Sequence, residues 1–249
     1  MKKLLASLLI GGLLTAGSAA RAATTIDTSS FSLAWLNGVS IGGNFSMNLL
    51  SDANGTAQIG LFMGLQSYTV GTAQAGGPAN GDIAYHQLAG SVRQGYRITS
   101  MTLSAVANGT LYVESLPCNV CYVEEGEATN NASIDIALTQ GGQRTEFGGT
   151  RVHDVIGQQA MTANASVPVD GDFLLDLSTG NDASASGTHQ VIFGSDWSTE
   201  RWLQATASIG VTDYLLTVQV APVPEPSTCA MLLAGLGVAG WAARRRKAS

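Results

Sequence analysis

The stretch Ser133-Ile134-Asp135-Ile136-Ala137-Leu138-Thr139 decides the fold class, because its large apolar side chains alternate with small or polar ones. A period of two residues is typical of a β-strand with one buried face and one exposed face. Residues Tyr96–Val106 alternate in a similar way, with a slight break at Leu103. Both stretches therefore predict half-buried antiparallel strands.

Similar short runs fill residues 23–221, which lack long helical periodicity. The dipeptides Asn54-Gly55, Asn108-Gly109, Gly141-Gly142 and Asp170-Gly171 supply the positive φ that hairpin turns need. Strands repeating every 8–15 residues or so favour an all-β, antiparallel β-sandwich, jelly-roll-like in type. A short helix within 64–75 or 196–204 is the local alternative. We expect strands at Ser40–Leu50, Thr56–Leu65, Gly95–Val106, Thr110–Ser115, Ala132–Thr139, Phe173–Asp176, Thr188–Phe193, Trp202–Ile209 and Tyr214–Val220.

Composition and charge exclude several classes of protein. The chain has 249 residues, of which 45% are hydrophobic and 12% are charged, with only 3 cysteines, so it is neither a disordered polyelectrolyte nor a disulfide-dense miniprotein. Residues 23–221 hold five arginines, no lysine and seventeen Asp and Glu, a net charge of −12. Such a body repels nucleic acid and anionic lipid, and we expect neither as a partner. The acidity indicates solubility outside the cell or, alternatively, cation binding.

Residues 1–22 predict a secretory signal peptide. The basic start Met1-Lys2-Lys3 precedes the apolar run Leu4–Leu14, and Ala20-Arg21-Ala22 is a small-x-small cleavage site. The mature chain is therefore expected to begin at Ala23. The apolar run is too short to span a bilayer comfortably, which disfavours a retained membrane helix.

Residues 222–249 contain three features in a fixed order: the segment Val223-Pro224-Glu225-Pro226-Ser227, an apolar run over 228–243, and the basic cluster Arg244-Arg245-Arg246-Lys247. An apolar helix of this length barely crosses a hydrocarbon core of about 30 Å. The basic cluster is expected to stay in the cytoplasm. We therefore expect a short transmembrane helix at 228–243 that holds the body on the outer side.

This order of features resembles the PEP-CTERM sorting signal of exported proteins in Gram-negative bacteria, many of which make extracellular polysaccharide. The resemblance covers about 223–247 only. It implies recognition by an exosortase after export by the secretion machinery, with transient residence in the inner membrane and processing near Pro224-Glu225-Pro226. Two prolines keep that segment extended and accessible. Cys229 is either a small apolar side chain or, alternatively, a lipidation site.

Cys118 and Cys121 form a C-x-x-C pattern. In an exported protein we expect these two thiols to form a local disulfide. A redox site or a zinc site with histidine ligands is the alternative, although no second metal-binding motif accompanies the pair. The surrounding segment 116–131 is acidic and is a candidate domain boundary or inserted loop.

Asp170, Asp172 and Asp176 are a weak candidate calcium site, to which Asp182 is close in sequence. Their spacing does not match an EF-hand loop, and Asp170-Gly171 is also explained by a hairpin turn. We expect no other cofactor. The sequence contains no nucleophile elbow and no phosphate-binding glycine motif.

Taken together, these features predict a non-enzymatic, exported protein of the cell surface or extracellular matrix. We expect a structural or adhesive role in a biofilm, associated with exopolysaccharide. The alternative is a secreted carbohydrate-active hydrolase or carbohydrate-binding module on a jelly-roll frame, which requires paired carboxylates or stacking aromatics. Candidate aromatic side chains for stacking on sugars are Trp35, Trp197, Trp202, Tyr68, Tyr85, Tyr96, Tyr112, Tyr122 and Tyr214.

Overall fold

A computed structural model describes residues 25–39, 45–223, 231 and 234–236 of the chain. Within these residues, the regular structure consists of β-strands in three antiparallel sheets, with helical residues at 231 and 234–236. The expected all-β, antiparallel fold is confirmed. The narrower jelly-roll assignment stays a prediction.

The first layer is a seven-stranded sheet in the order β1-β2-β6-β13-β9-β10, in which β11 also pairs with β9. Its central strands are long, and β13 pairs with β6 over Asp172–Ser184 and with β9 over Leu174–Ser186. Buried and exposed side chains alternate along these strands, as a two-faced sheet requires. The strands are β1 (Thr25–Asp27), β2 (Phe31–Val39), β6 (Ala79–Val92), β9 (Glu127–Gln140), β10 (Gln143–Gly148), β11 (Arg151–His153) and β13 (Asp172–Ser186).

The second layer is a six-stranded sheet in the order β12-β7-β16-β4-β3, in which β5 also pairs with β16. The longest strands, β7 and β16, pair from Val113 opposite Ala205 to Tyr96 opposite Pro222. Two register shifts, between Thr212 and Leu215 and between Gln219 and Val220, interrupt this ladder. The strands are β3 (Ser46–Ala53), β4 (Thr56–Phe62), β5 (Tyr68–Thr72), β7 (Tyr96–Val113), β12 (Gly157–Ala165) and β16 (Ala205–Pro222).

The two large sheets pack face to face and enclose one hydrophobic core, with β13 and β9 lying against β16 and β7. Core side chains such as Leu103, Ile134 and Leu216 are fully buried. Burying a side chain of this size stabilises the fold by about 1.5–3 kcal/mol. We call this two-layer unit the sandwich body.

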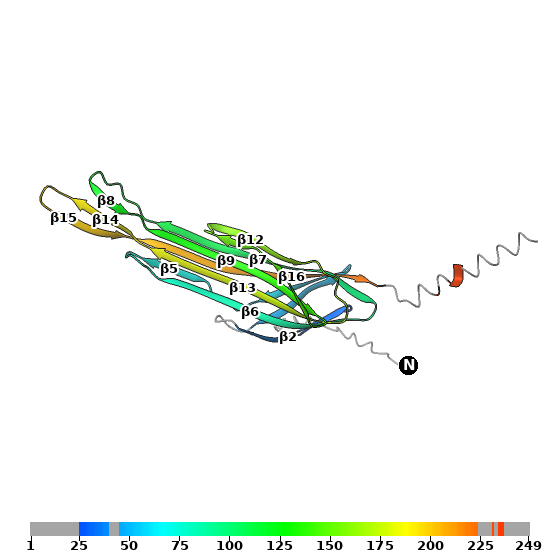
Figure 1. The fold of residues 1–249 in the computed structure, drawn as a ribbon. Helices are drawn as coiled ribbons and strands as arrows, with labels where there is room; N and C mark the ends of the chain where they lie inside the picture. The colour runs from blue at the N-terminus through cyan, green and yellow to red at the C-terminus, as the bar shows by residue number, and fades with distance from the viewer. Residues whose placement is uncertain (1–24, 40–44, 224–230, 232–233, 237–249) are drawn as a thin grey trace, which may run out of the picture.

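The third sheet has three strands in the order β15-β14-β8, and we call it the distal sheet. It lies at one end of an elongated molecule, and β16 ends at the opposite end (Figure 1). With 18 residues, β16 spans about 60 Å at ~3.3 Å per residue. The strands of the distal sheet are β8 (Cys121–Glu124), β14 (Thr188–Phe193) and β15 (Ser198–Leu203).

The expected turn at Asn108-Gly109 is wrong, because both residues lie inside β7. The two strands expected on either side of it are therefore one strand. The glycine serves a close approach instead, since a Cβ atom on Gly109 would lie 2.5 Å from the Val155 carbonyl oxygen and 2.7 Å from Asn130 Nδ2. Residues 64–75 and 196–204, where a short helix was the alternative, contain β5 and β15.

Several expectations fall on residues outside the described ranges. These are the signal peptide 1–22 with its cleavage site at Ala20, Ala22 and Ala23, the segment Pro224–Ser227, and the basic cluster Arg244–Lys247. Most of the expected membrane helix 228–243 also lies outside them. Among the residues that are described, no helix has the length and apolar character needed to cross a membrane.

Candidate functional site

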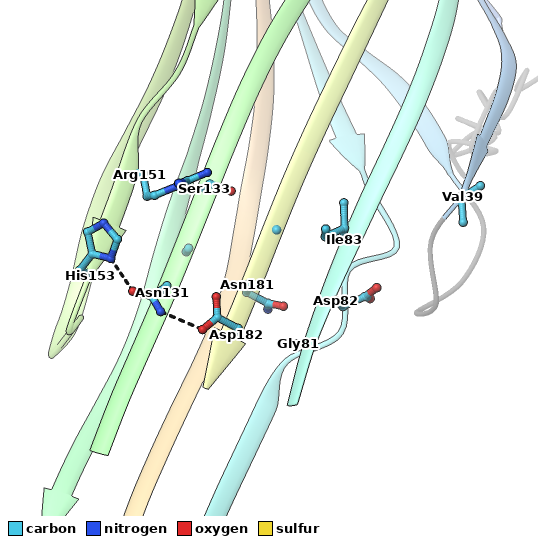
Figure 2. A pocket seen from close by; sticks show the side chains of 12 residues that line it. Val39, Gly81, Asp82, Ile83, Asn131, Ser133, Arg151, His153, Asn181 and Asp182 are labelled. Carbon is cyan, nitrogen blue, oxygen red and sulfur yellow. Dashed lines mark hydrogen bonds between the residues drawn. The ribbon is translucent and has the colours of Figure 1, made fainter. Parts of the chain in front are cut away.

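A shallow cavity of about 710 Å³ lies on the outer face of the seven-stranded sheet (Figure 2). Its floor includes Gly81 on β6, Gly180 on β13 and Ser133 on β9. Because these residues have no side chain or a small one, the surface of the sheet is hollowed at this point. The exposed apolar side chains of Val39 and Ile83 line the β2 and β6 side of the cavity.

Polar side chains from three strands form a row across this cavity. Asn131 on β9 lies opposite Asp182 on β13 and opposite His153 on β11. Its Nδ2 donates to Asp182 Oδ2 at 2.8 Å, and its Oδ1 contacts His153 Nδ1. With the amide in this orientation, His153 Nδ1 carries the hydrogen and donates it to Asn131 Oδ1. In neutral His153, Nε2 is then free to accept a hydrogen bond.

The cavity therefore combines hydrogen-bonding groups with an apolar edge, a mixture that suits a polyhydroxylated ligand. Arg151 lies opposite Ser133 at the same rim. No hydrogen bond joins Ser133 to His153 in the described structure, so this row does not form the nucleophile–base pair that covalent catalysis needs.

A second cavity of about 190 Å³ lies farther along the same face, around Asp176 on β13. The Asp176 carboxylate is 5% exposed and accepts hydrogen bonds from Tyr85 Oη (2.8 Å), Gln87 Nε2 (2.8 Å) and Arg144 Nε (3.1 Å). Burial alone would raise the pKa of Asp176, but these hydrogen bonds and the Arg144 charge outweigh it and hold the pKa below its ordinary value. Arg144 also pairs with Glu146.

The three residues of the candidate calcium site are not brought together. Asp170 pairs with Arg97 at 2.8 Å, and Asp172 accepts a hydrogen bond from Ser91 Oγ at 2.7 Å. Asp176 lies four residues beyond Asp172 on the same strand, about 13 Å away at ~3.3 Å per residue, with the partners given above. Within the part of the chain that the structure describes, no cluster of three or more His, Cys, Asp or Glu side chains is placed to hold a metal ion.

The structure does bring Cys118 and Cys121 together, as a disulfide with a Cα–Cα distance of 5.9 Å. The bond closes a short loop immediately before β8. Segment 116–131, the candidate boundary or inserted loop, thus supplies this loop, β8 and the start of β9. It connects the distal sheet to the sandwich body.

Sequence reasoning did not find the row of Asn131, His153 and Asp182 as a unit. The alternation in β9 predicts that Asn131 shares a face with Ser133 and Asp135. It does not reveal that β11 and β13 are the neighbouring strands, because that depends on a register formed by residues far apart in the sequence.

The chain leaves the sandwich body at Val223, whose backbone N–H donates to the Gly95 carbonyl at 2.8 Å. Residues 222–247 match the model of the PEP-CTERM protein-sorting motif. A search of curated proteins found no match to the chain. The expected sorting signal is therefore confirmed, and with it the identification of an exported, membrane-processed protein whose signal an exosortase recognises.

Proposed function

We propose that this exported exosortase target is a non-enzymatic protein of the cell surface or extracellular matrix of a Gram-negative bacterium, with a structural or adhesive role in association with exopolysaccharide. One observation carries the proposal. A single strand, β16, starts beside the distal sheet and ends at the sorting motif.

The two ends of the elongated molecule therefore differ, with the sorting motif at one end and the distal sheet at the other. The sorting motif begins at Pro222, the last residue of β16, so the molecule is handled at this end. The distal sheet lies at the other end, about 60 Å away by the rise per residue of a strand (Figure 1). A two-layer body with a continuous core separates them and resists bending. These features support a role as a rigid spacer that presents its far end to the surroundings.

The surface chemistry of the body supports contact with a hydrated polymer. Two cavities on the outer face of the seven-stranded sheet carry the side chains of Arg151, His153 and Asp182 in one, and of Tyr85 and Asp135 in the other. These side chains offer hydrogen bonds in both directions along an open sheet face. The net charge of −12 over residues 23–221 keeps such a body soluble outside the cell.

Asp176 does not fit the general acid of a glycoside hydrolase. Glycoside hydrolysis ordinarily uses one carboxyl with a raised pKa as the general acid and a second as nucleophile or base. Asp176 has a lowered pKa, and Arg144 pairs with both Asp176 and the nearby Glu146. This arrangement fits a structural cluster, which supports the non-enzymatic reading.

The test is fractionation of the host culture into envelope, polysaccharide matrix and medium. We expect the protein to sediment with the matrix and to be released when the polysaccharide is removed enzymatically. Protein that stays in the medium whether or not the polysaccharide is present would contradict the proposal, as would protein that stays in the inner membrane.

A further inference from the structure

One face of the distal sheet is partly covered, and we call it the covered face; the other face is open. On the covered face, Gln190 is 1% exposed, and its Nε2 donates to the Leu116 carbonyl at 2.9 Å. Its Oε1 accepts from Arg201 Nε at 2.8 Å and from Arg201 Nη2 at 2.6 Å. The segment that contains the disulfide thus packs over this face. The guanidinium of Arg201 is held on the same face by its two hydrogen bonds to Gln190.

The open face displays aromatic and acidic side chains. In β14, His189, Val191 and Phe193 alternate with Gln190 and therefore point to the opposite face. Their register partners share that face with them. We call it the aromatic face, and its members are Tyr122, Glu124, His189, Val191, Phe193, Ser198, Glu200 and Trp202.

The rings on this face are well placed for a ligand. Tyr122 is 58% exposed and Phe193 is 49% exposed. Trp202 stacks on His189 with a centroid distance of 4.3 Å and an interplanar angle of 14°, which holds the indole in place. Tyr122 and Trp202 lie two strands apart, about 10 Å across the sheet at ~4.8 Å per strand. Trp197, in the β14–β15 turn, is a further exposed ring.

Acidic side chains flank these rings. His189 Nε2 lies 3.5 Å from Glu200 Oε2, and His189 Nδ1 lies 4.0 Å from Glu124 Oε2. Apart from His189, the aromatic face has no basic side chain. Acidic side chains also outnumber basic ones over the whole end of the molecule. Residues 114–127 and 188–204 contain six acidic side chains and one arginine: Glu114, Glu124, Glu125, Glu127, Asp196, Glu200 and Arg201.

We infer that the aromatic face of the distal sheet binds a polysaccharide that carries free amino groups. Aromatic rings with polar edges stack on the C–H faces of sugars. An ammonium group is attracted both to an aromatic ring and to the flanking carboxylates, whereas a uronic acid or sulfated sugar is repelled by them. The inference rests on the proposed function and adds to it a site and a ligand class.

The experiment measures binding of the mature protein, purified from its host, to three soluble probes: glucosamine oligomers, N-acetylglucosamine oligomers and uronic acid oligomers. We expect the glucosamine oligomers to bind most tightly, and to bind more weakly as salt concentration rises. Tyr122→Ala is expected to weaken this binding about tenfold through loss of the ring. Glu200→Gln, which keeps the shape of the side chain, is expected to weaken binding about fivefold and to reduce its salt dependence.

Matched controls lie on the sandwich body. Tyr96→Ala removes an exposed tyrosine at the opposite end of β7, and Asp52→Asn removes an exposed carboxylate of the six-stranded sheet that lines neither cavity. Both are expected to bind glucosamine oligomers like the unsubstituted chain. Circular dichroism and thermal unfolding of each variant confirm that the fold is intact.

The outcomes separate this inference from the proposed function. If all variants bind glucosamine oligomers equally well, the aromatic face is not the site, while the association with polysaccharide stands. If only neutral or acidic oligomers bind, or if a polylysine peptide binds as tightly as glucosamine oligomers, the ligand class is wrong. If the chain binds none of the glycans and does not sediment with the matrix, both the inference and the proposed function fail.

Discussion

The sandwich body and the distal sheet are both built from antiparallel strands, but they differ in how far their large side chains are buried. In the body, alternate residues such as Leu103 and Leu216 are sealed between two layers. In the distal sheet, Tyr122 and Phe193 face solvent, and the covered face is anchored by the polar side chain of Gln190. We therefore expect most of the stability to come from the body, and we propose that the far end carries the recognition site.

The largest effect is expected from a cavity in the body. Leu216→Ala removes a fully buried side chain of β16 and should lower the free energy of unfolding by about 2–5 kcal/mol. Val123→Ala, on the exposed β8, should change it by less than about 0.5 kcal/mol. Denaturant unfolding measures both. Equal losses in the two variants would remove the distinction between body and distal sheet.

The second effect concerns a polar side chain inside the body. Asn130 is fully buried, its Nδ2 donates to the carbonyls of Val155 (3.0 Å) and Ser208 (2.7 Å), and its Oδ1 accepts from Val155 N–H (2.6 Å). Asn130→Ala leaves these groups without partners and should cost about 1–3 kcal/mol of unfolding free energy. The neighbouring Asn131→Ala, on the outer face, should cost clearly less. The reverse order in denaturant unfolding would contradict this account of the core.

A third prediction uses pH. Because the pKa of Asp176 is lowered in the folded protein, its ionised form contributes stability above the ordinary carboxyl pKa, and this contribution is lost as pH falls through the lowered value. Asp176→Asn should therefore weaken the loss of stability on acidification below about pH 4. Unfolding measured across that pH range tests it. An unchanged acid dependence would show that the hydrogen bonds from Tyr85, Gln87 and Arg144 do not stabilise the charge.

The smallest global effect is expected at the disulfide. Replacing Cys118 and Cys121 by serine opens a loop with a sequence separation of only 3. Because the bond closes only a very short loop, the global unfolding free energy should fall by no more than about 2 kcal/mol. Hydrogen exchange should nevertheless become faster in β8 and stay unchanged in β13. Faster exchange throughout β13 would mean that the distal sheet helps to hold the body together.

Local patterns predicted several elements well. The strand Thr188–Phe193 is confirmed with the bounds read from the sequence. The turn at Asn54-Gly55 is confirmed by φ values of 53° and 74°, and that at Gly141-Gly142 by 58° and 81°. These features depend on short-range alternation and on the backbone freedom of Gly and Asn, which one sequence displays directly.

Other elements depend on contacts between distant residues. Strand β6 was not expected, since its start, Ala79-Asn80-Gly81-Asp82, has the composition of a loop. It is a strand because β2 and β13 pair with it on both sides. The same long-range register creates the row of Asn131, His153 and Asp182 and the aromatic face of the distal sheet. Outside hairpins such as those at Asn54-Gly55 and Gly141-Gly142, spacing along the chain does not reveal which strands become neighbours.

The central claim is that an exported body is handled at the end of β16, with the distal sheet held at the far end. Intact mass and peptide mapping of the protein recovered from envelope and medium test it most directly. We expect a species that starts near Ala23 and ends near Pro224-Glu225-Pro226, without Arg244–Lys247. A mature species that retains Arg244–Lys247 in the inner membrane would contradict it.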